Sequence, residues 1–201
     1  MKNSIKNQIF KKISRQPPGW AFSAYDFIQD FIRREIDESL SYLATDGKIR
    51  RVISGIYDIP MHSEFLMMDV APDINQVADA LARKFNWKIF PNGDTALNYL
   101  GLSNQITAKN LYFTDGPNNK YHIGNQCIEF KHISQKETAL VYENTGLVIH
   151  AIKAVGEKQI TQEFLDKLTE KFSRDEWSKI KKDASNSTGW VYKIIREIYN
   201  E

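Results

Sequence analysis

The first sixty residues combine three segments of helical periodicity with two short strands, and this order constrains the fold more than any other feature of the sequence. Apolar residues recur at helical spacing over residues 3–14. A second helix is predicted over residues 24–31, and a third begins near Arg34. Two strands with a Ser-Gly turn between them follow within residues 48–60. Three helices followed by a β-hairpin are typical of a winged helix-turn-helix, which we assign to residues 1–60.

Local signals support the second and third helices. Ser23, followed three residues later by Asp26, resembles a capping box and predicts the start of the second helix. In the third helix Ile36, Leu40 and Leu43 fall on one side, so this side is predicted to be buried. The opposite side is therefore free to contact a partner.

Charge favours DNA as that partner. The first sixty residues carry ten Lys and Arg against seven Asp and Glu, a net charge of +3, whereas the remainder carries 17 against 18. A helix fits the major groove of B-DNA, and a hairpin can reach the adjacent backbone. The residues predicted to contact DNA are Arg33, Arg34, Ser41, Tyr42, Thr45, Lys48, Arg50 and Arg51. The alternative is a protein-docking module, because Glu35, Asp37 and Glu38 are poorly placed for phosphate.

Residues 61–201 are predicted to form an α+β domain with a C-terminal helical extension, which makes the whole chain α+β. Four strands are predicted to form a small antiparallel sheet, in which 120–123 pairs back across a turn onto 110–114. The other two strands are 87–90 and 126–131. The predicted helices are 74–85, 95–100, 140–155, 161–172, 174–184 and 190–199.

Few residues suggest catalysis. The four histidines show no paired spacing typical of metal ligands, and the single cysteine excludes an internal disulfide. We therefore expect no catalytic residues, no metal and no cofactor. One alternative is a metal-dependent nuclease, in which Asp115 and Glu129 would hold Mg²⁺ and Lys131 would steady the attacking water or the phosphate.

The chain is expected to reside in the cytoplasm and not in a membrane. No stretch approaches the roughly 18 consecutive apolar residues of a membrane span. The first residues lead into a charged amphipathic segment rather than into the apolar core of a secretory signal.

An ordered series of short motifs over about residues 3–155 resembles the AbiE-type, or type IV, antitoxin family of bacterial transcriptional regulators. The matching stretches are PGWAF at 18–22, GKIRR at 47–51, GIY at 55–57, PNG at 91–93, NYLGLS at 98–103, YFTDGP at 112–117, IG at 123–124 and FKH at 130–132.

The resemblance implies a regulator rather than an enzyme. In this family the winged helix binds inverted repeats in the promoter of its own operon, and the second domain helps to counter a nucleotidyltransferase-like toxin, a system associated with phage defence. By resemblance, Lys48, Arg50, Arg51 and the exposed side of the third helix map onto the DNA surface. Because an inverted repeat presents two half-sites, a homodimer or paired monomers are expected.

Overall fold

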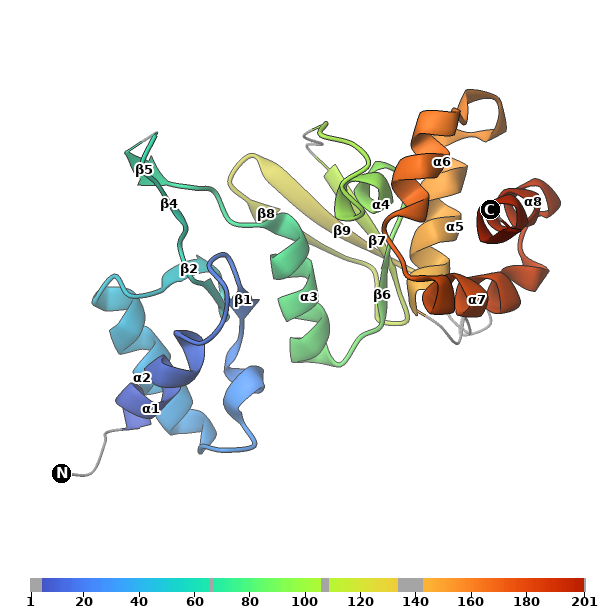
Figure 1. Cartoon of the computed structure of the whole chain (residues 1–201). Helices are drawn as coiled ribbons and strands as arrows, with labels where there is room; N and C mark the ends of the chain where they lie inside the picture. The colour runs from blue at the N-terminus through green and yellow to red at the C-terminus, as the bar shows by residue number, and fades with distance from the viewer. Residues whose placement is uncertain (1–4, 66, 106–108, 134–142, 201) are drawn as a thin grey trace. The chain divides into compact units, whose positions relative to one another are not determined.

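The computed structural model describes residues 5–65, 67–105, 109–133 and 143–200 and shows an α+β protein (Figure 1). Within these residues no helix is long and apolar enough to cross a membrane. The chain divides into two compact units, Met1–Trp87 and Lys88–Glu201. The first unit therefore extends beyond residue 60 and includes a segment that the sequence analysis placed in the second region.

The first unit begins with the expected alternation of helices and strands. Its three-stranded sheet is antiparallel in the order β1-β3-β2, so the first strand pairs with the second arm of the hairpin. The elements are α1 (Ile5–Ile13), β1 (Ala21–Phe22), the 3₁₀ helix η1 (Ala24–Phe27), α2 (Arg33–Thr45), β2 (Arg50–Ile53) and β3 (Ile56–Asp58). This is the element order expected of a winged helix-turn-helix.

The core of the first unit joins both helices to the sheet. Ile36, Leu40 and Leu43 are fully buried, as the sequence predicted, and pack with Ile9 and Phe22. Removal of this much apolar surface from water is the main stabilising contribution to such a core. The buried side of α2 is therefore fixed, and its opposite side faces solvent.

The second predicted helix is only a 3₁₀ turn. The capping box is present, because the Asp26 carboxylate accepts from the Ser23 backbone at 2.8 Å. Phe27 is buried, but Ile28 and the residues immediately after it are exposed, so no apolar side continues beyond η1. The prediction of a helix over residues 24–31 was too long for this reason.

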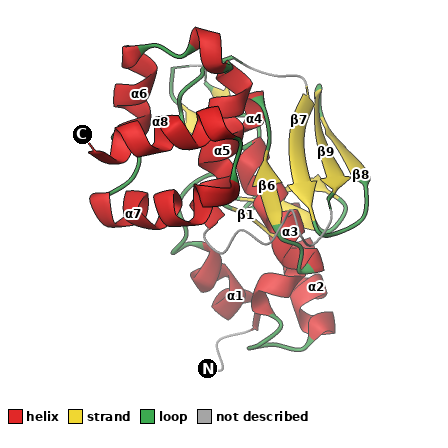
Figure 2. Cartoon of the chain, turned by 90° about the vertical axis from the view of Figure 1, so that its right-hand side faces the viewer, coloured by secondary structure: helices red, strands yellow, loops and turns green. Residues whose placement is uncertain are grey.

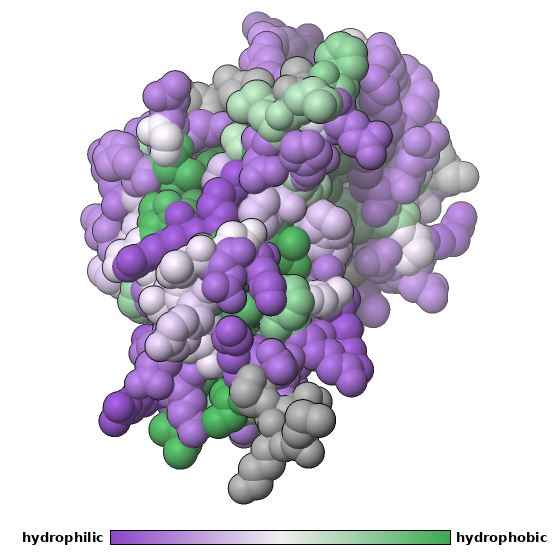
Figure 3. Space-filling model, turned by 90° about the vertical axis from the view of Figure 1, so that its left-hand side faces the viewer, coloured by the Kyte–Doolittle hydropathy of each residue, from purple (hydrophilic) through white to green (hydrophobic). Residues whose placement is uncertain are grey.

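A connector and a third helix complete the first unit. The connector contains two paired strands, β4 (His62–Ser63) and β5 (Met68–Asp69), and leads to α3 (Ile74–Phe85). Asp73 caps α3 as predicted, accepting from the backbone of Asn75 at 2.8 Å. On the face displayed in Figure 3, hydrophilic residues dominate and hydrophobic ones form small separate groups.

The second unit contains a four-stranded sheet in the order β6-β7-β9-β8 (Figure 2). Its strands are β6 (Ile89–Pro91), β7 (Lys109–Thr114), β8 (Asn119–Ile123) and β9 (Gln126–His132). The sheet is mainly antiparallel, and only β7 and β9 pair in parallel.

The predicted pairing of residues 120–123 with 110–114 is wrong, because β9 lies between them. β9 buries Ile128 and Phe130 completely or nearly so, whereas most side chains of β8 are exposed. The apolar strand therefore takes the interior position, and the polar strand takes the edge, where charged side chains are common. The two-residue turn at Gly124 joins β8 to β9 as a hairpin.

Helices form the rest of the second unit. They are α4 (Asp94–Tyr99), α5 (Glu143–Val155), α6 (Gln162–Thr169), α7 (Arg174–Asp183) and α8 (Gly189–Asn200), with short 3₁₀ turns η2 (Glu157–Gln159) and η3 (Ala184–Asn186). α4 and α5 lie beside the β6 edge of the sheet (Figure 2). Thr161 and Ser173 cap α6 and α7. The predicted start of the helix at residues 140–142 lies outside the described residues.

Candidate nucleic-acid interface

The exposed side of α2 presents most of the residues predicted to read DNA. Ile36, Leu40 and Leu43 point into the core, so the periodicity of the helix turns the other side outward. The predicted residues on this exposed side are Arg34, Ser41, Tyr42 and Thr45. Tyr42 is 63% exposed, and the Lys6 Nζ lies 5.9 Å from the centre of its ring.

Acidic residues occupy the same helix and pair with its arginines. Arg33 donates to Asp37 at 2.8 Å and Arg34 donates to Glu38 at 2.9 Å, both one helical turn apart. All four side chains are more than half exposed, so these ion pairs contribute little stability. Either arginine can therefore exchange its carboxylate for a phosphate or a base edge at small energetic expense.

The two arginines of the hairpin point in opposite directions because successive strand residues alternate between faces. Arg50 turns inward and donates from Nε and Nη2 to the two carboxylate oxygens of Asp58, at 3.0 and 2.5 Å. Its Nη1 donates to the Val70 carbonyl at 2.8 Å. The Asp58 side chain is only 1% exposed. The Arg50 guanidinium is therefore committed to a buried carboxylate, which argues against the predicted phosphate contact.

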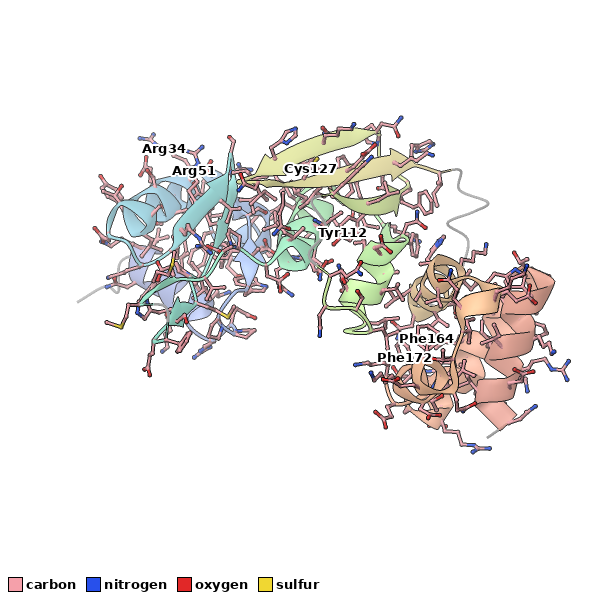
Figure 4. The ribbon with its side chains drawn as sticks, turned by 90° about the horizontal axis from the view of Figure 1, so that it is seen from above. Arg34, Arg51, Tyr112, Cys127, Phe164 and Phe172 are labelled. Carbon is pink, nitrogen blue, oxygen red and sulfur yellow. The ribbon has the colours of Figure 1, made fainter. Side chains whose placement is uncertain are left out.

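Among the residues that the structure describes, Arg51 and Lys48 have no carboxylate partner. Arg51 is exposed beside the hairpin turn, where its Nη2 donates weakly to the Ser54 hydroxyl at 3.4 Å. Lys48 lies just after the end of α2, with its Nζ 5.0 Å from the centre of the Phe10 ring. Figure 4 shows Arg34 and Arg51 on the same side of the first unit. These positions fit the predicted surface.

Lys84, which the sequence analysis did not select, joins the arginines near the hairpin turn. Its Nζ lies 3.5 Å from the Ser54 carbonyl oxygen. Burial, together with the positive charge of Arg33, lowers the pKa of Lys84. We call Arg33, Arg34, Arg51 and Lys84 the basic cluster; they come from the start of α2, the hairpin and the last turn of α3.

The residues of the nuclease alternative are not brought together. Asp115 accepts from the Lys88 backbone at 2.8 Å and follows Thr114, which pairs with His132. At about 3.3 Å per residue, this places Asp115 about 13 Å along the sheet from Glu129. Within the described ranges no group of three His, Cys, Asp or Glu side chains is arranged to hold a metal ion.

Glu129 is instead the centre of an ion-pair network. It pairs with Lys109 at 2.5 Å and with Lys120 at 3.7 Å across neighbouring strands. The hydrogen bond and charge of Lys109 lower the pKa of Glu129, with Lys120 adding to the effect. Lys131 shares this face of the sheet, as expected, but the carboxylate already has two cationic partners.

Comparison with known proteins places the chain in a family without supplying a function. No curated protein matches the sequence. Residues 8–180, which cover most of both units, match DUF6088, described as a family of unknown function. The chain therefore belongs to the DUF6088 family.

Proposed function

We propose that the protein is a transcriptional regulator of the antitoxin type that binds double-stranded DNA through its first unit. The observation that carries this proposal is the basic cluster, which unites cationic side chains at the start of α2 and at the hairpin turn. The hairpin of β2 and β3 follows α2 after a short turn, which is the element order of a winged helix. Positive charge on one side of a small unit is the electrostatic footprint of a polyanion partner.

The proposed contacts divide into base reading and backbone binding. The N-terminal part of α2 would enter the major groove, where the Arg34 guanidinium can donate two hydrogen bonds to a guanine. Ser41, Tyr42 and Thr45 would follow along the groove. Lys48 and Arg51 would bind the backbone on either side and fix the register without reading sequence.

The partners beyond DNA follow from the sequence resemblance. The target would be an inverted repeat in the promoter of the protein's own operon, so two copies of the first unit are needed, one for each half-site. A nucleotidyltransferase-like toxin would be the protein whose activity is countered. In this proposal the chain regulates its own operon, counters the toxin and catalyses no reaction of its own.

A gel-shift titration on the protein's own upstream DNA and on scrambled DNA, at two salt concentrations, tests the proposal. Arg34→Ala is expected to weaken binding to the upstream DNA by about 1–3 kcal/mol, roughly 5- to 150-fold, with a smaller effect on scrambled DNA. Arg196→Ala, which removes the same charge from an exposed site on α8, serves as the control. Absence of any shift at low salt would refute DNA binding.

Removal of the acidic partner of Arg34 should strengthen non-specific binding. Glu38→Gln frees the guanidinium and deletes one negative charge from the side of α2 that faces phosphate, so affinity for scrambled DNA is expected to rise several-fold. The control is Glu163→Gln, because Glu163 pairs with Lys167 at 2.7 Å one turn apart in α6. Weaker binding of Glu38→Gln to scrambled DNA would show that this side of α2 does not face the backbone.

One observation favours the protein-docking alternative. A pocket of about 520 Å³ lies between α1 and α2 and includes Ile5, Glu35, Glu38 and Tyr42 in its lining. α2 also carries three carboxylates against two arginines. A protein with a basic anchor would suit this pocket better than DNA would. Lack of DNA affinity at low salt, together with a protein partner that dissociates when Glu35 is replaced by Lys, would establish this alternative.

A further inference from the structure

Lys84 is held against the hairpin turn although it belongs to a helix outside the winged-helix elements. The turn residue Gly55 has φ +75°, and a Cβ atom there would lie 2.9 Å from Lys84 Nζ. Glycine thus both permits the left-handed backbone and leaves room for the ammonium group. The Ser54 carbonyl, at 3.5 Å, is the nearby acceptor.

The rest of α3 keeps this lysine in position. Arg83, its neighbour, donates from Nε to Asp26 at 2.7 Å and from Nη2 to the Ala21 carbonyl at 2.7 Å. These contacts fasten the last turn of α3 to η1 and β1. Lys84 is therefore presented to the hairpin turn by a fixed backbone rather than by a free chain end.

The surroundings of Lys84 lack a compensating negative charge. Within the described part of the chain, neither Lys84 nor Arg51 forms an ion pair with a carboxylate. Arg33 lies close enough that its positive charge disfavours the charged form of the lysine. Arg33 has Asp37 as its partner, whereas Arg51 and Lys84 have no carboxylate among the described residues, so a bound anion would relieve the repulsion between these cations.

We propose that Arg33, Arg51 and Lys84 together bind one phosphate of the DNA backbone, so that α3 extends the DNA-binding surface beyond the winged helix. A phosphate offers several acceptor oxygens and suits donors that converge from different directions. These three side chains lie at the hairpin turn, at the end of α3 and at the first residue of α2, away from the residues proposed to read bases, so they position the duplex and read no base. This inference rests on the DNA binding proposed above and assigns one of its contacts.

Salt titrations of Lys84→Gln on upstream and scrambled DNA test the inference. Loss of one phosphate contact should reduce the slope of log affinity against log salt by about 0.9, and should weaken binding about fivefold on both DNAs near physiological salt. Lys84→Arg should keep the salt slope and the affinity of the unaltered protein. Lys11→Gln removes an exposed charge from α1, outside the basic cluster, and is expected to behave as the unaltered protein.

The outcomes separate the inference from the proposed function. If the unaltered protein binds DNA and Lys84→Gln keeps the same slope and affinity, the phosphate site is overturned while DNA binding stands. If Lys84→Gln weakens only the upstream DNA, the lysine reads sequence and the phosphate assignment is wrong. If the unaltered protein binds neither the upstream nor the scrambled DNA at low salt, the phosphate site and the proposed function both fail. Matching thermal unfolding of the variants shows that any loss is one of binding rather than of folding.

Discussion

Replacing Arg50 with alanine is expected to destabilise the first unit by about 3–5 kcal/mol, because it leaves a buried carboxylate without its partner. Both oxygens of Asp58 accept from this guanidinium, and the Asp58 side chain is 1% exposed. The third contact, to the Val70 carbonyl, also joins the hairpin to the connector. Lysine cannot make this two-pronged contact with the carboxylate, so Arg50→Lys should be more stable than Arg50→Ala but less stable than the unaltered protein.

Urea unfolding followed by circular dichroism, with peptide-resolved hydrogen exchange to identify the first unit, measures this effect. Arg51→Ala is the matched control. The Arg51 side chain neighbours Arg50 in the sequence but is exposed, so its removal should change stability by about 0.5 kcal/mol or less. The double variant Arg50→Met with Asp58→Leu should be more stable than Arg50→Ala, since it removes both charges. A loss below about 1 kcal/mol in Arg50→Ala would mean that water solvates Asp58.

The different roles of these neighbouring arginines determine how DNA binding can be tested. A variant that removes Arg50 and Arg51 together would lose affinity by unfolding even if neither residue touched DNA. Arg51→Ala alone keeps the ion pair to Asp58 and reports on the backbone contact, with an expected loss of about fivefold and a smaller salt dependence. Equal salt dependence in Arg51→Ala and the unaltered protein would remove the hairpin from the DNA surface.

Local patterns explain why much of the fold was predictable. Ser23 with Asp26, and Asp73 before α3, mark element starts through hydrogen bonds that span only a few residues. Ile36, Leu40 and Leu43 share one side of α2 by helical periodicity alone. Such signals depend on neighbours in the sequence, and so the α+β class and most element positions could be inferred from the sequence alone.

Long-range contacts explain what the sequence did not reveal. Which of Arg50 and Arg51 turns inward depends on strand register and on Asp58, eight residues from Arg50. Lys84 reaches Ser54 across 30 residues. The only sequence hint was a basic pair in the last turn of α3, which is equally typical of a solvated helix end that complements the helix dipole. The order of β8 and β9 likewise depended on which strand pairs along both edges, and the more apolar β9 takes that interior position.

The second unit should lose stability in mild acid because of His150. The imidazole is largely buried in α5, with its ring centre 5.1 Å from that of Phe113. Burial, with a smaller effect of Lys153, lowers the pKa of His150 from 6.5 to about 4. The unfolded chain therefore takes up a proton at higher pH than the folded unit, and stability falls as the pH decreases from 6.5 towards 4.

The expected loss over this interval is about 3 kcal/mol, with about 2 kcal/mol of it already lost by pH 5, before most carboxylates titrate. Urea unfolding between pH 7.5 and 5, with hydrogen exchange assigned to the second unit, measures the slope. His150→Phe keeps an aromatic ring against Phe113 but cannot take up a proton, so its stability should hardly change over the same range. An NMR titration of His150 with a pKa near 6.5 would contradict the prediction, because the folded and unfolded states would then bind the proton equally. A low pKa together with a flat stability profile in the unaltered protein would mean that the unfolded chain also holds the pKa of His150 low, which would overturn the prediction.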